Sequence, residues 1–237
     1  MNLLTIFVFV LIIVLIYVVY KLMTKTTSAV SGFSDASKSL MVPCSKSSGI
    51  ATTNNFGYSA WLYIDSWVSN ASGATINKNM LTRCNSDNVP MFQLYLDNEQ
   101  NNMNLVIQAN APCTIVNVQL QKWINITMSV YGNTTDLYLD GKLVRTSIMT
   151  VLPPALASSD NLYIGGSYDA TTNTFADGDL QGYISNVIYK ADYFTPEEAW
   201  SIYSDGYSGA GMFNFINSYK LIFSVTKDNE TVGQVSI

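Results

Sequence analysis

The sequence predicts an all-β protein, an antiparallel sandwich of the jelly-roll type with one short helix, preceded by a single transmembrane helix. Three observations predict this organisation. Residues 3–20 are apolar except for Thr5, the residues from Phe56 onward alternate between apolar and polar in short runs, and one helix start signal appears among these runs, at Thr195. Alternation with period two is typical of strands that bury one face, and many short strands separated by turns are typical of sandwiches and jelly rolls.

The predicted strands are short, and turn-forming pairs of residues separate them. The clearest hairpin is predicted at Asp140-Gly141, which lies between two short apolar runs, because Asp-Gly favours a two-residue turn. The predicted strands span residues 58–64, 91–96, 103–108, 123–130, 137–139, 142–145, 162–164 and 183–189.

The single predicted helix begins after Thr195. The Thr195 hydroxyl can cap the helix, Pro196 suits the first helical position, and Glu198 completes a capping box. Glu197 and Glu198 could be taken for a pair of catalytic acids. Carboxylates in a first helical turn are, however, ordinary capping and dipole chemistry, so we interpret both as structural.

The N-terminal run has the length of a membrane span, roughly 27 Å as a helix. A cleaved signal peptide is the alternative, but no basic residue precedes the run and no Ala-x-Ala cleavage pattern follows it, so the sequence favours an uncleaved anchor. The anchor residues that we expect to face lipid are Leu3, Phe7, Leu11, Ile16 and Tyr20.

Charge around this run predicts its orientation and the division of the chain. Lys21 and Lys25 follow the run, and basic residues beside a span are retained in the cytosol, so the C-terminal domain is expected on the cytosolic side. The predicted divisions are an anchor at 1–23, a juxtamembrane linker at 24–48 with a short strand near 39–42, a jelly roll at 49–205, and an extension at 206–237. The extension is predicted to form two strands, one of which could close the sheet beside the first strand of the jelly roll, residues 58–64.

Composition excludes several classes of function. The formal charge of −5 argues against a nucleic-acid partner, which requires clustered Lys and Arg. The chain has no histidine, which removes Ser-His-Asp and Cys-His sites. Cys44, Cys84 and Cys113 form no CxxC pair, so we expect no zinc site, and either a Cys84–Cys113 bridge or three buried thiols fits the sequence.

Five segments in the same order carry a resemblance to a known family. They are residues 59–62 (SAWL), 123–127 (WINIT) with 137–142 (LYLDGK), 162–166 (LYIGG), 180–187 (LQGYISNV) and 195–203 (TPEEAWSIY). Over Phe56 to Tyr203 the chain resembles laminin-G-like, concanavalin A-like jelly rolls. The resemblance implies a sandwich in which the Trp and Ile residues of these segments alternate inward, as Trp123 would.

This fold hosts lectins, glucanases and adhesion modules, so each site needs its own evidence. The chain has four Glu residues and none lies in the acidic strand that glucanases use, so we expect no enzymatic activity and no cofactor. The loop acids Asp169, Asp177 and Asp179 could form a calcium site similar to those on the rim of laminin-G domains. We favour the other interpretation, a solvated polar loop, and therefore expect no metal site.

The overall design resembles that of membrane-anchored minor capsid proteins of large algal DNA viruses. This resemblance implies a structural protein that lies in the virion between an internal membrane and the capsid shell, with the lipid bilayer and capsid or other structural proteins as partners. Phe213 and Phe215 in the extension are candidate docking residues. The alternative is a membrane-displayed, carbohydrate-binding (lectin-like) domain, for which the sequence shows no defined site.

Overall fold

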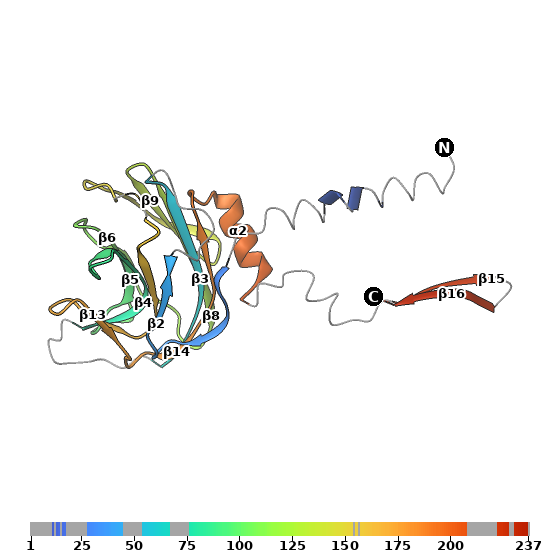
Figure 1. Cartoon of the computed structure of the whole chain (residues 1–237), viewed down its shortest axis with the longest axis horizontal. Helices are drawn as coiled ribbons and strands as arrows, with labels where there is room; N and C mark the ends of the chain where they lie inside the picture. Colours follow the sequence, from blue (N-terminus) through green and yellow to red (C-terminus); the bar gives the residue numbers. More distant parts are fainter. Residues whose placement is uncertain are drawn as a thin grey trace.

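The chain forms a two-layer antiparallel sandwich with one short helix on its outside (Figure 1). The structure is a computed structural model, and it describes residues 11, 13–14, 16–17, 28–44, 54–66, 76–153, 155, 157–207, 222–227 and 230–236. Every strand pair in the described residues is antiparallel. The predicted all-β sandwich with a short helix is therefore confirmed.

The six-stranded layer is called sheet A here, and the eight-stranded layer sheet B. In spatial order, sheet A contains β1 (Ser28–Asp35), β14 (Gln181–Lys190), β3 (Phe56–Ser66), β8 (Trp123–Tyr131), β9 (Thr134–Leu139) and β10 (Lys142–Ile148). Sheet B contains β13 (Thr174–Ala176), β12 (Ser167–Asp169), β4 (Ile76–Cys84), β5 (Pro90–Leu96), β6 (Met103–Ile107) and β7 (Cys113–Ile115), with β11 (Asn161–Ile164) between β4 and β2 (Leu40–Pro43).

Period-two alternation assigns the two faces of the central strand β3. Phe56, Tyr58, Ala60, Leu62 and Ile64 all belong to the hydrophobic core between the sheets. The odd-numbered residues between them must then face the outside of sheet A, because successive strand side chains point to opposite faces. Strand β8 follows the same rule, with its even-numbered residues 124, 126, 128 and 130 in the core.

This alternation corrects the predicted inward position of Trp123. Ile124 and Ile126 occupy core positions, so Trp123, one residue earlier, lies on the outer face of sheet A and is only half-buried. Trp61 is also on the outer face, but it is buried there, because the rings of Tyr203 and Tyr207 pack against it.

Part of the segment predicted as a linker, residues 24–48, belongs to the sandwich instead. Strand β1 pairs with β14 at one edge of sheet A, and β2 pairs with β11 in sheet B, where a short strand near 39–42 was predicted. Strand β1 escapes pattern analysis because its pairing with β14 shifts register twice, between Ser28 and Val30 and between Val30 and Phe33. Such irregularities remove the simple alternation that identifies a strand.

The two strands expected in the C-terminal extension are β15 (Ile222–Lys227) and β16 (Glu230–Ser236). They pair with each other as a separate two-stranded sheet and extend neither layer of the sandwich. The sequence analysis left open whether a strand of the extension pairs with β3. Neither does, because β14 and β8 already occupy the two edges of β3.

The predicted membrane anchor falls mostly outside the described residues. Leu11 and Ile16 are helical and exposed, whereas Leu3, Phe7 and Tyr20 lie outside the described part of the chain. Within the residues that the structure describes, no helix is long and apolar enough to cross a bilayer.

Candidate ligand-binding face

The outer face of sheet A carries a row of aromatic side chains that register brings together. Tyr63 pairs with Trp123 across β3 and β8, and Tyr63 pairs on its other side with Tyr183 of β14. The Tyr63 ring lies 5.6 Å from the Trp123 ring and 6.5 Å from the Tyr183 ring, measured between centroids. Paired residues on one face of a sheet lie within contact distance, so the three rings form a continuous row across three strands.

Two further rings pack against Trp123. Tyr207, just after α2 (Pro196–Asp205), stacks on Trp123 at 4.9 Å with an interplanar angle of 7°. Phe33 of β1 lies 5.6 Å from Trp123, and 61% of Phe33 is exposed to solvent. We call these five residues, Phe33, Tyr63, Trp123, Tyr183 and Tyr207, the aromatic face. Large exposed apolar groups gathered in one place commonly mark a binding surface.

A hollow of about 360 Å³ opens at the Tyr63–Tyr183 end of the aromatic face. Besides the two tyrosines, its lining includes two carboxylates and one amide, contributed by Asp35, Asp65 and Gln181. Gly182 forms part of its wall with φ of 155°, and a Cβ there would collide with the Tyr63 carbonyl oxygen. A glycine is therefore required where β14 passes β3 at this point.

Asp35 is held in the ionised form at neutral pH. Its Oδ1 accepts hydrogen bonds from the Ser37 backbone N–H at 2.9 Å and from the Ser37 hydroxyl at 2.8 Å. These bonds lower the pKa of Asp35 below its usual value, since they stabilise the charged carboxylate. The hollow thus combines a fixed negative charge with hydrogen-bond acceptors and aromatic rings.

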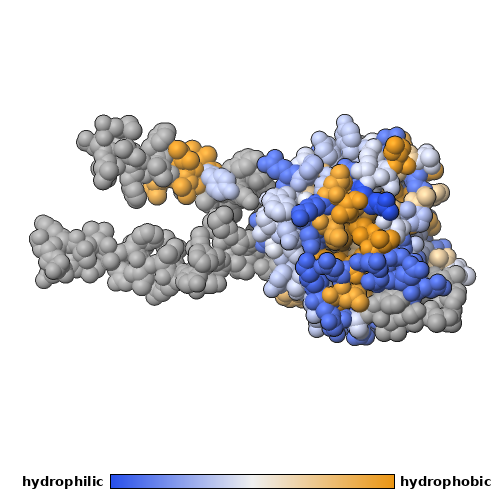
Figure 2. All heavy atoms as spheres, turned by 180° about the vertical axis from the view of Figure 1, so that it is seen from behind, coloured by the Kyte–Doolittle hydropathy of each residue, from blue (hydrophilic) through white to orange (hydrophobic). Residues whose placement is uncertain are grey.

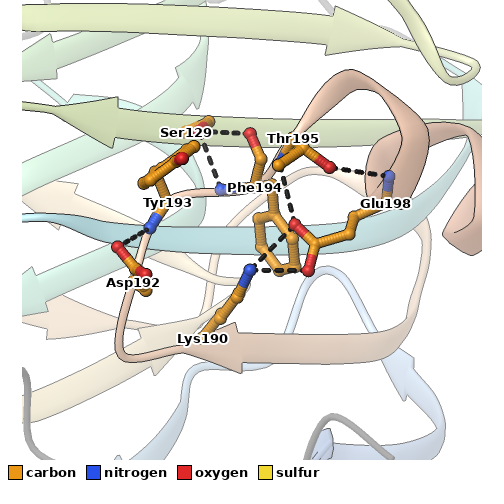
Figure 3. A network of polar contacts seen from close by, with 7 residues as sticks. All are labelled: Ser129, Lys190, Asp192, Tyr193, Phe194, Thr195 and Glu198. Carbon is orange, nitrogen blue, oxygen red and sulfur yellow. Dashed lines mark hydrogen bonds and ion pairs between the residues drawn. The ribbon is translucent and has the colours of Figure 1, made fainter. Parts of the chain in front are cut away.

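A row of buried polar side chains runs beside the aromatic face, under the helix. The Asn125 amide donates to the Ser59 hydroxyl at 3.1 Å, and the Thr127 hydroxyl donates to the same Ser59 oxygen at 2.8 Å. Further along β8, the Ser129 hydroxyl donates to the Phe194 carbonyl and accepts from the Phe194 N–H (Figure 3). These bonds fix the segment that leads into α2 against β8 and so hold the helix over one part of the outer face.

The start of α2 confirms the predicted capping box. The Thr195 hydroxyl accepts from the Glu198 N–H, and Glu198 accepts from the Thr195 N–H (Figure 3). Lys190 donates to both carboxylate oxygens of Glu198, at 2.6 and 2.8 Å. Glu198 is therefore structural, in agreement with the sequence interpretation.

The ionised form of Glu198 should stabilise the folded domain, and this stabilisation should be lost at pH values below the ordinary pKa of a glutamate. Burial raises the pKa of Glu198, but the hydrogen bonds from Lys190 and Thr195 outweigh burial, so the pKa lies below its ordinary value of 4.5. A lowered folded-state pKa contributes stability above the unfolded-state pKa, and this contribution is lost as pH falls through the folded-state value. We expect Glu198→Gln to reduce the free energy of unfolding at neutral pH by up to about 1 kcal/mol, and by less near pH 3.

Urea unfolding followed by circular dichroism at both pH values measures this difference. Glu197→Gln is the matched control, because Glu197 lies in the same helical turn and makes none of these bonds to Lys190 or Thr195. An equal effect of the two substitutions at neutral pH would contradict the assignment.

The three acids considered for calcium do not gather into a site. Asp177 accepts from Lys38 Nζ at 2.8 Å, and Asp169 accepts from the Thr171 N–H at 2.8 Å within its own turn. The negative charge of Asp179 acts on Lys78, whose pKa it raises against the larger, opposite effect of burial. Asp179 does not form a cluster with the other two acids. Among the described residues, no group of three or more His, Cys, Asp or Glu side chains is placed to hold a metal ion.

The two candidate docking residues and the three cysteines remain to be placed. Phe213 and Phe215 lie outside the described residues. Cys44, Cys84 and Cys113 are free and buried, so of the two possibilities left open the structure has three thiols and no Cys84–Cys113 bridge. Burial raises the pKa of Cys84 to about 12, which disfavours the reactive thiolate at neutral pH.

Comparison with known proteins identifies the family. Residues 35–198 match the concanavalin A-like lectin/glucanases superfamily. The chain belongs to this superfamily. No curated protein matches the chain.

Solved structures with a similar fold include a neurotoxin domain, a pentraxin and a sialidase. The ligand-binding domain of botulinum neurotoxin serotype D, solved in complex with N-acetylneuraminic acid, aligns with 77% of the chain and 44% of its own length, at 13% identity and a TM-score of 0.57. A heptameric SAP-like pentraxin from Limulus polyphemus aligns with 69% of the chain and 74% of its own length, at 13% identity and a TM-score of 0.50. The chain spans 23% of the length of the Trypanosoma rangeli sialidase, at 16% identity and a TM-score of 0.48. At these identities the likeness concerns the fold.

Proposed function

We propose that the sandwich is a non-enzymatic, carbohydrate-binding module that uses the aromatic face and the adjoining hollow. The observation that carries the proposal is the row Tyr183–Tyr63–Trp123, which ends in a hollow lined by Asp35 and Asp65. A sugar ring has apolar C–H faces that pack on aromatic rings, and it has hydroxyls that donate hydrogen bonds to carboxylate and amide oxygens. Binding sites for small polar ligands commonly combine such apolar walls with a few convergent polar groups.

The superfamily supports this proposal, because its description includes lectins. The neurotoxin domain with the same fold was solved with a sugar, N-acetylneuraminic acid. The charged groups of the hollow in this chain are both carboxylates, so the module proposed here is suited to a neutral or amino sugar rather than to an anionic one. An anionic sugar would have to lose water beside the ionised Asp35, which is unfavourable.

The proposal includes no hydrolysis. Glycoside hydrolysis requires one carboxyl group that stays protonated as the general acid, with a raised pKa. Hydrogen bonds from Ser37 shift the pKa of Asp35 in the opposite direction. We therefore assign Asp35 to recognition rather than to proton donation.

The sequence supports a second candidate function, which we propose as the alternative to the first. The apolar run at 3–20 suits an anchor that would hold the sandwich on the cytosolic side of a membrane. In a virion, a sandwich tethered in this way would lie between an internal membrane and the capsid shell as a minor capsid protein. The aromatic face would then contact a structural protein, because aromatic side chains are enriched at the centres of protein interfaces.

Trp123→Ala should weaken sugar binding about tenfold or more, because one lost ring contact of about 1.4 kcal/mol changes the affinity by that factor. The measurement is isothermal titration calorimetry of the full-length protein in detergent with neutral oligosaccharides chosen from an array. Tyr131→Ala is the control, since Tyr131 is an exposed aromatic at the far end of the same strand, where its ring contacts Tyr193.

Equal loss of binding in the two variants would contradict the assignment to the aromatic face. Absence of sugar binding, together with recovery of a capsid-type protein that Trp123→Ala no longer retains, would favour the second candidate alone.

A further inference from the structure

The two ends of the sandwich differ in exposed apolar surface and in charge. Strand β1 begins with Ser28 at one end and finishes at the other end with Asp35, which lines the hollow. We call the end at which β1 begins the Ser28 end. Ser28 pairs with Ile188 near the last residue of β14. Because every pair in sheet A is antiparallel, β14, β8 and β10 finish at this end, and β3 and β9 begin there.

Strands of sheet B reach the same end. Arg83, near the end of β4, donates to the hydroxyl of Tyr58, near the start of β3, at 2.7 Å. The Asn110 side chain, just after β6, bonds to the backbone of Val151, just after β10. The described loops at the Ser28 end are therefore 85–89, 108–112, 132–133, 149–153, 157–160 and 191–195.

Large apolar side chains are exposed at the Ser28 end. They are Val89, Tyr131, Ile148, Val151 and Leu152, and Ile148 is 76% exposed. Tyr131 and Ile148 lie in one row across the sheet, since both pair with Thr134. Figure 2 shows the face of the molecule that is hidden in Figure 1, and apolar side chains form a band on it. Exposed apolar groups gathered in this way commonly mark a contact surface.

The Ser28 end also carries little charge. Residues 107–118 and 146–159, which contain the two long loops of this end, include no Asp, Glu, Lys or Arg. Among the described residues of its loops, the exposed charged side chains are Asp87 and Asp192. The loops at the opposite end carry the charged residues Lys38, Asp97, Glu99, Asp140 and Asp177. Bringing charges into an apolar phase is costly, so the Ser28 end is the better suited of the two to contact one.

The sequence indicates which apolar phase lies within reach of this end. The apolar run at 3–20, predicted to be a membrane anchor, is separated from Ser28 by the seven residues 21–27. Seven residues span at most about 25 Å when fully extended. With the anchor in a bilayer, the start of β1 stays within this distance of the span. A tether this short gives an effective concentration on the order of millimolar, so weak contacts suffice for docking.

We propose that the Ser28 end rests on the surface of the lipid bilayer, with Ile148, Val151 and Leu152 inserted between the lipid headgroups. Tyr131 suits the interface, because its ring is apolar and its hydroxyl stays in contact with water. The hollow then points away from the membrane, since it lies at the Asp35 end of β1, about 23 Å along the strand. The inference rests on the predicted anchor, and it holds whichever partner the aromatic face binds.

Fluorescence quenching in vesicles tests this contact. Full-length Ile148→Cys is labelled in detergent with a small neutral fluorophore. It is then reconstituted into phosphatidylcholine vesicles containing a lipid with a nitroxide close to its headgroup. Leu143→Cys is the matched control, because Leu143 is an exposed apolar residue of the same strand, about 16 Å further from the Ser28 end. Wild type, whose three cysteines are buried, gives the background labelling.

The label at position 148 should lose most of its fluorescence, and the label at position 143 should keep almost all of it. Adding phosphatidylserine to the vesicles should not increase the quenching, because the exposed charges in the loops of this end, Asp87 and Asp192, are acidic.

A double substitution tests whether the apolar side chains hold the domain on the lipid. Val151→Asp combined with Leu152→Asp should lower the ratio of docked to undocked domain at least about tenfold, since two apolar side chains no longer enter the lipid. Leu143→Asp combined with Val144→Asp is the control, because it changes two exposed residues outside the contact and should leave quenching at position 148 unchanged.

Three outcomes would overturn the proposal. They are equal quenching at positions 148 and 143, quenching that requires phosphatidylserine, and unchanged quenching when Val151 and Leu152 are replaced. If that double variant does not fold, as circular dichroism would show, the comparison of positions 148 and 143 still decides.

Alkaline extraction of the vesicles tests the anchor separately. Release of the protein would refute the anchor and this inference with it, whereas a retained protein with an unquenched label contradicts the docking alone. Neither result affects the sugar titration in detergent, so failure of this inference is distinguishable from failure of the proposed function.

Discussion

Replacing Asp160 with alanine will destabilise the domain by about 3–5 kcal/mol, the range measured for removal of one partner from a buried ion pair. Asp160 Oδ2 lies 3.1 Å from Arg83 Nε, and both side chains are only 3% exposed. Arg83 also donates to the Tyr58 hydroxyl at 2.7 Å and to the Ala157 carbonyl at 3.1 Å. Without Asp160, the guanidinium would remain in the interior with its charge uncompensated.

A double substitution distinguishes the cost of a broken ion pair from the value of the intact one. Arg83→Met combined with Asp160→Leu removes both charges and fills the space with apolar groups, a change that is often neutral or stabilising. We expect urea unfolding to show that the double variant recovers most of the stability lost in Asp160→Ala. A double variant as unstable as the single one would mean that the hydrogen bonds to Tyr58 and Ala157, rather than the charges, hold this region together.

Trp61→Ala will cost about 3–5 kcal/mol, because it leaves a cavity beneath the helix. Trp61 is 4% exposed, and its ring stacks on Tyr203 at 5.7 Å and meets the Tyr207 ring edge-on at 6.1 Å. The same substitution at Trp123 serves as the control. Trp123 lies on the same face but is only half-buried, so we expect its loss to cost less than half as much.

Urea unfolding of the two variants tests this comparison directly. If Trp123→Ala proved as destabilising as Trp61→Ala, Trp123 would be a structural residue, and its assignment to a ligand-binding face would lose its basis.

The sequence predicted the fold well wherever strands alternate regularly. Each predicted strand overlaps an observed one, and the predicted hairpin at Asp140-Gly141 joins β9 to β10, with φ of 50° at Asp140 and 72° at Gly141. Strand β4 was missed because it carries Lys78, Asn79 and Arg83 at buried positions, where the pattern calls for apolar residues. Strands β7, β12 and β13 have three residues each, too few to show a period.

The candidate site was not predicted, because it depends on which strands become neighbours. Tyr63, Trp123 and Tyr183 lie far apart in the sequence, and only the register of β14, β3 and β8 places them in one row. One signal was available: the even-numbered Ile124 and Ile126 already imply that Trp123 faces the other side of its strand. The hollow also uses Asp35 from the segment that the sequence assigned to a linker.

Strand β1 also determines how the domain responds to tension. Among the described strands it lies at the edge of sheet A and pairs with β14 alone, and two register shifts interrupt that ladder. Within the described part of the chain, a pull on Ser28 would reach the sandwich through this ladder, whereas β3 is hydrogen-bonded to a neighbouring strand on each edge. Under load, β1 would separate first and carry Phe33 and Asp35 with it, so mechanical strain at the N-terminal side would disrupt the aromatic face and its hollow before it disrupted the core.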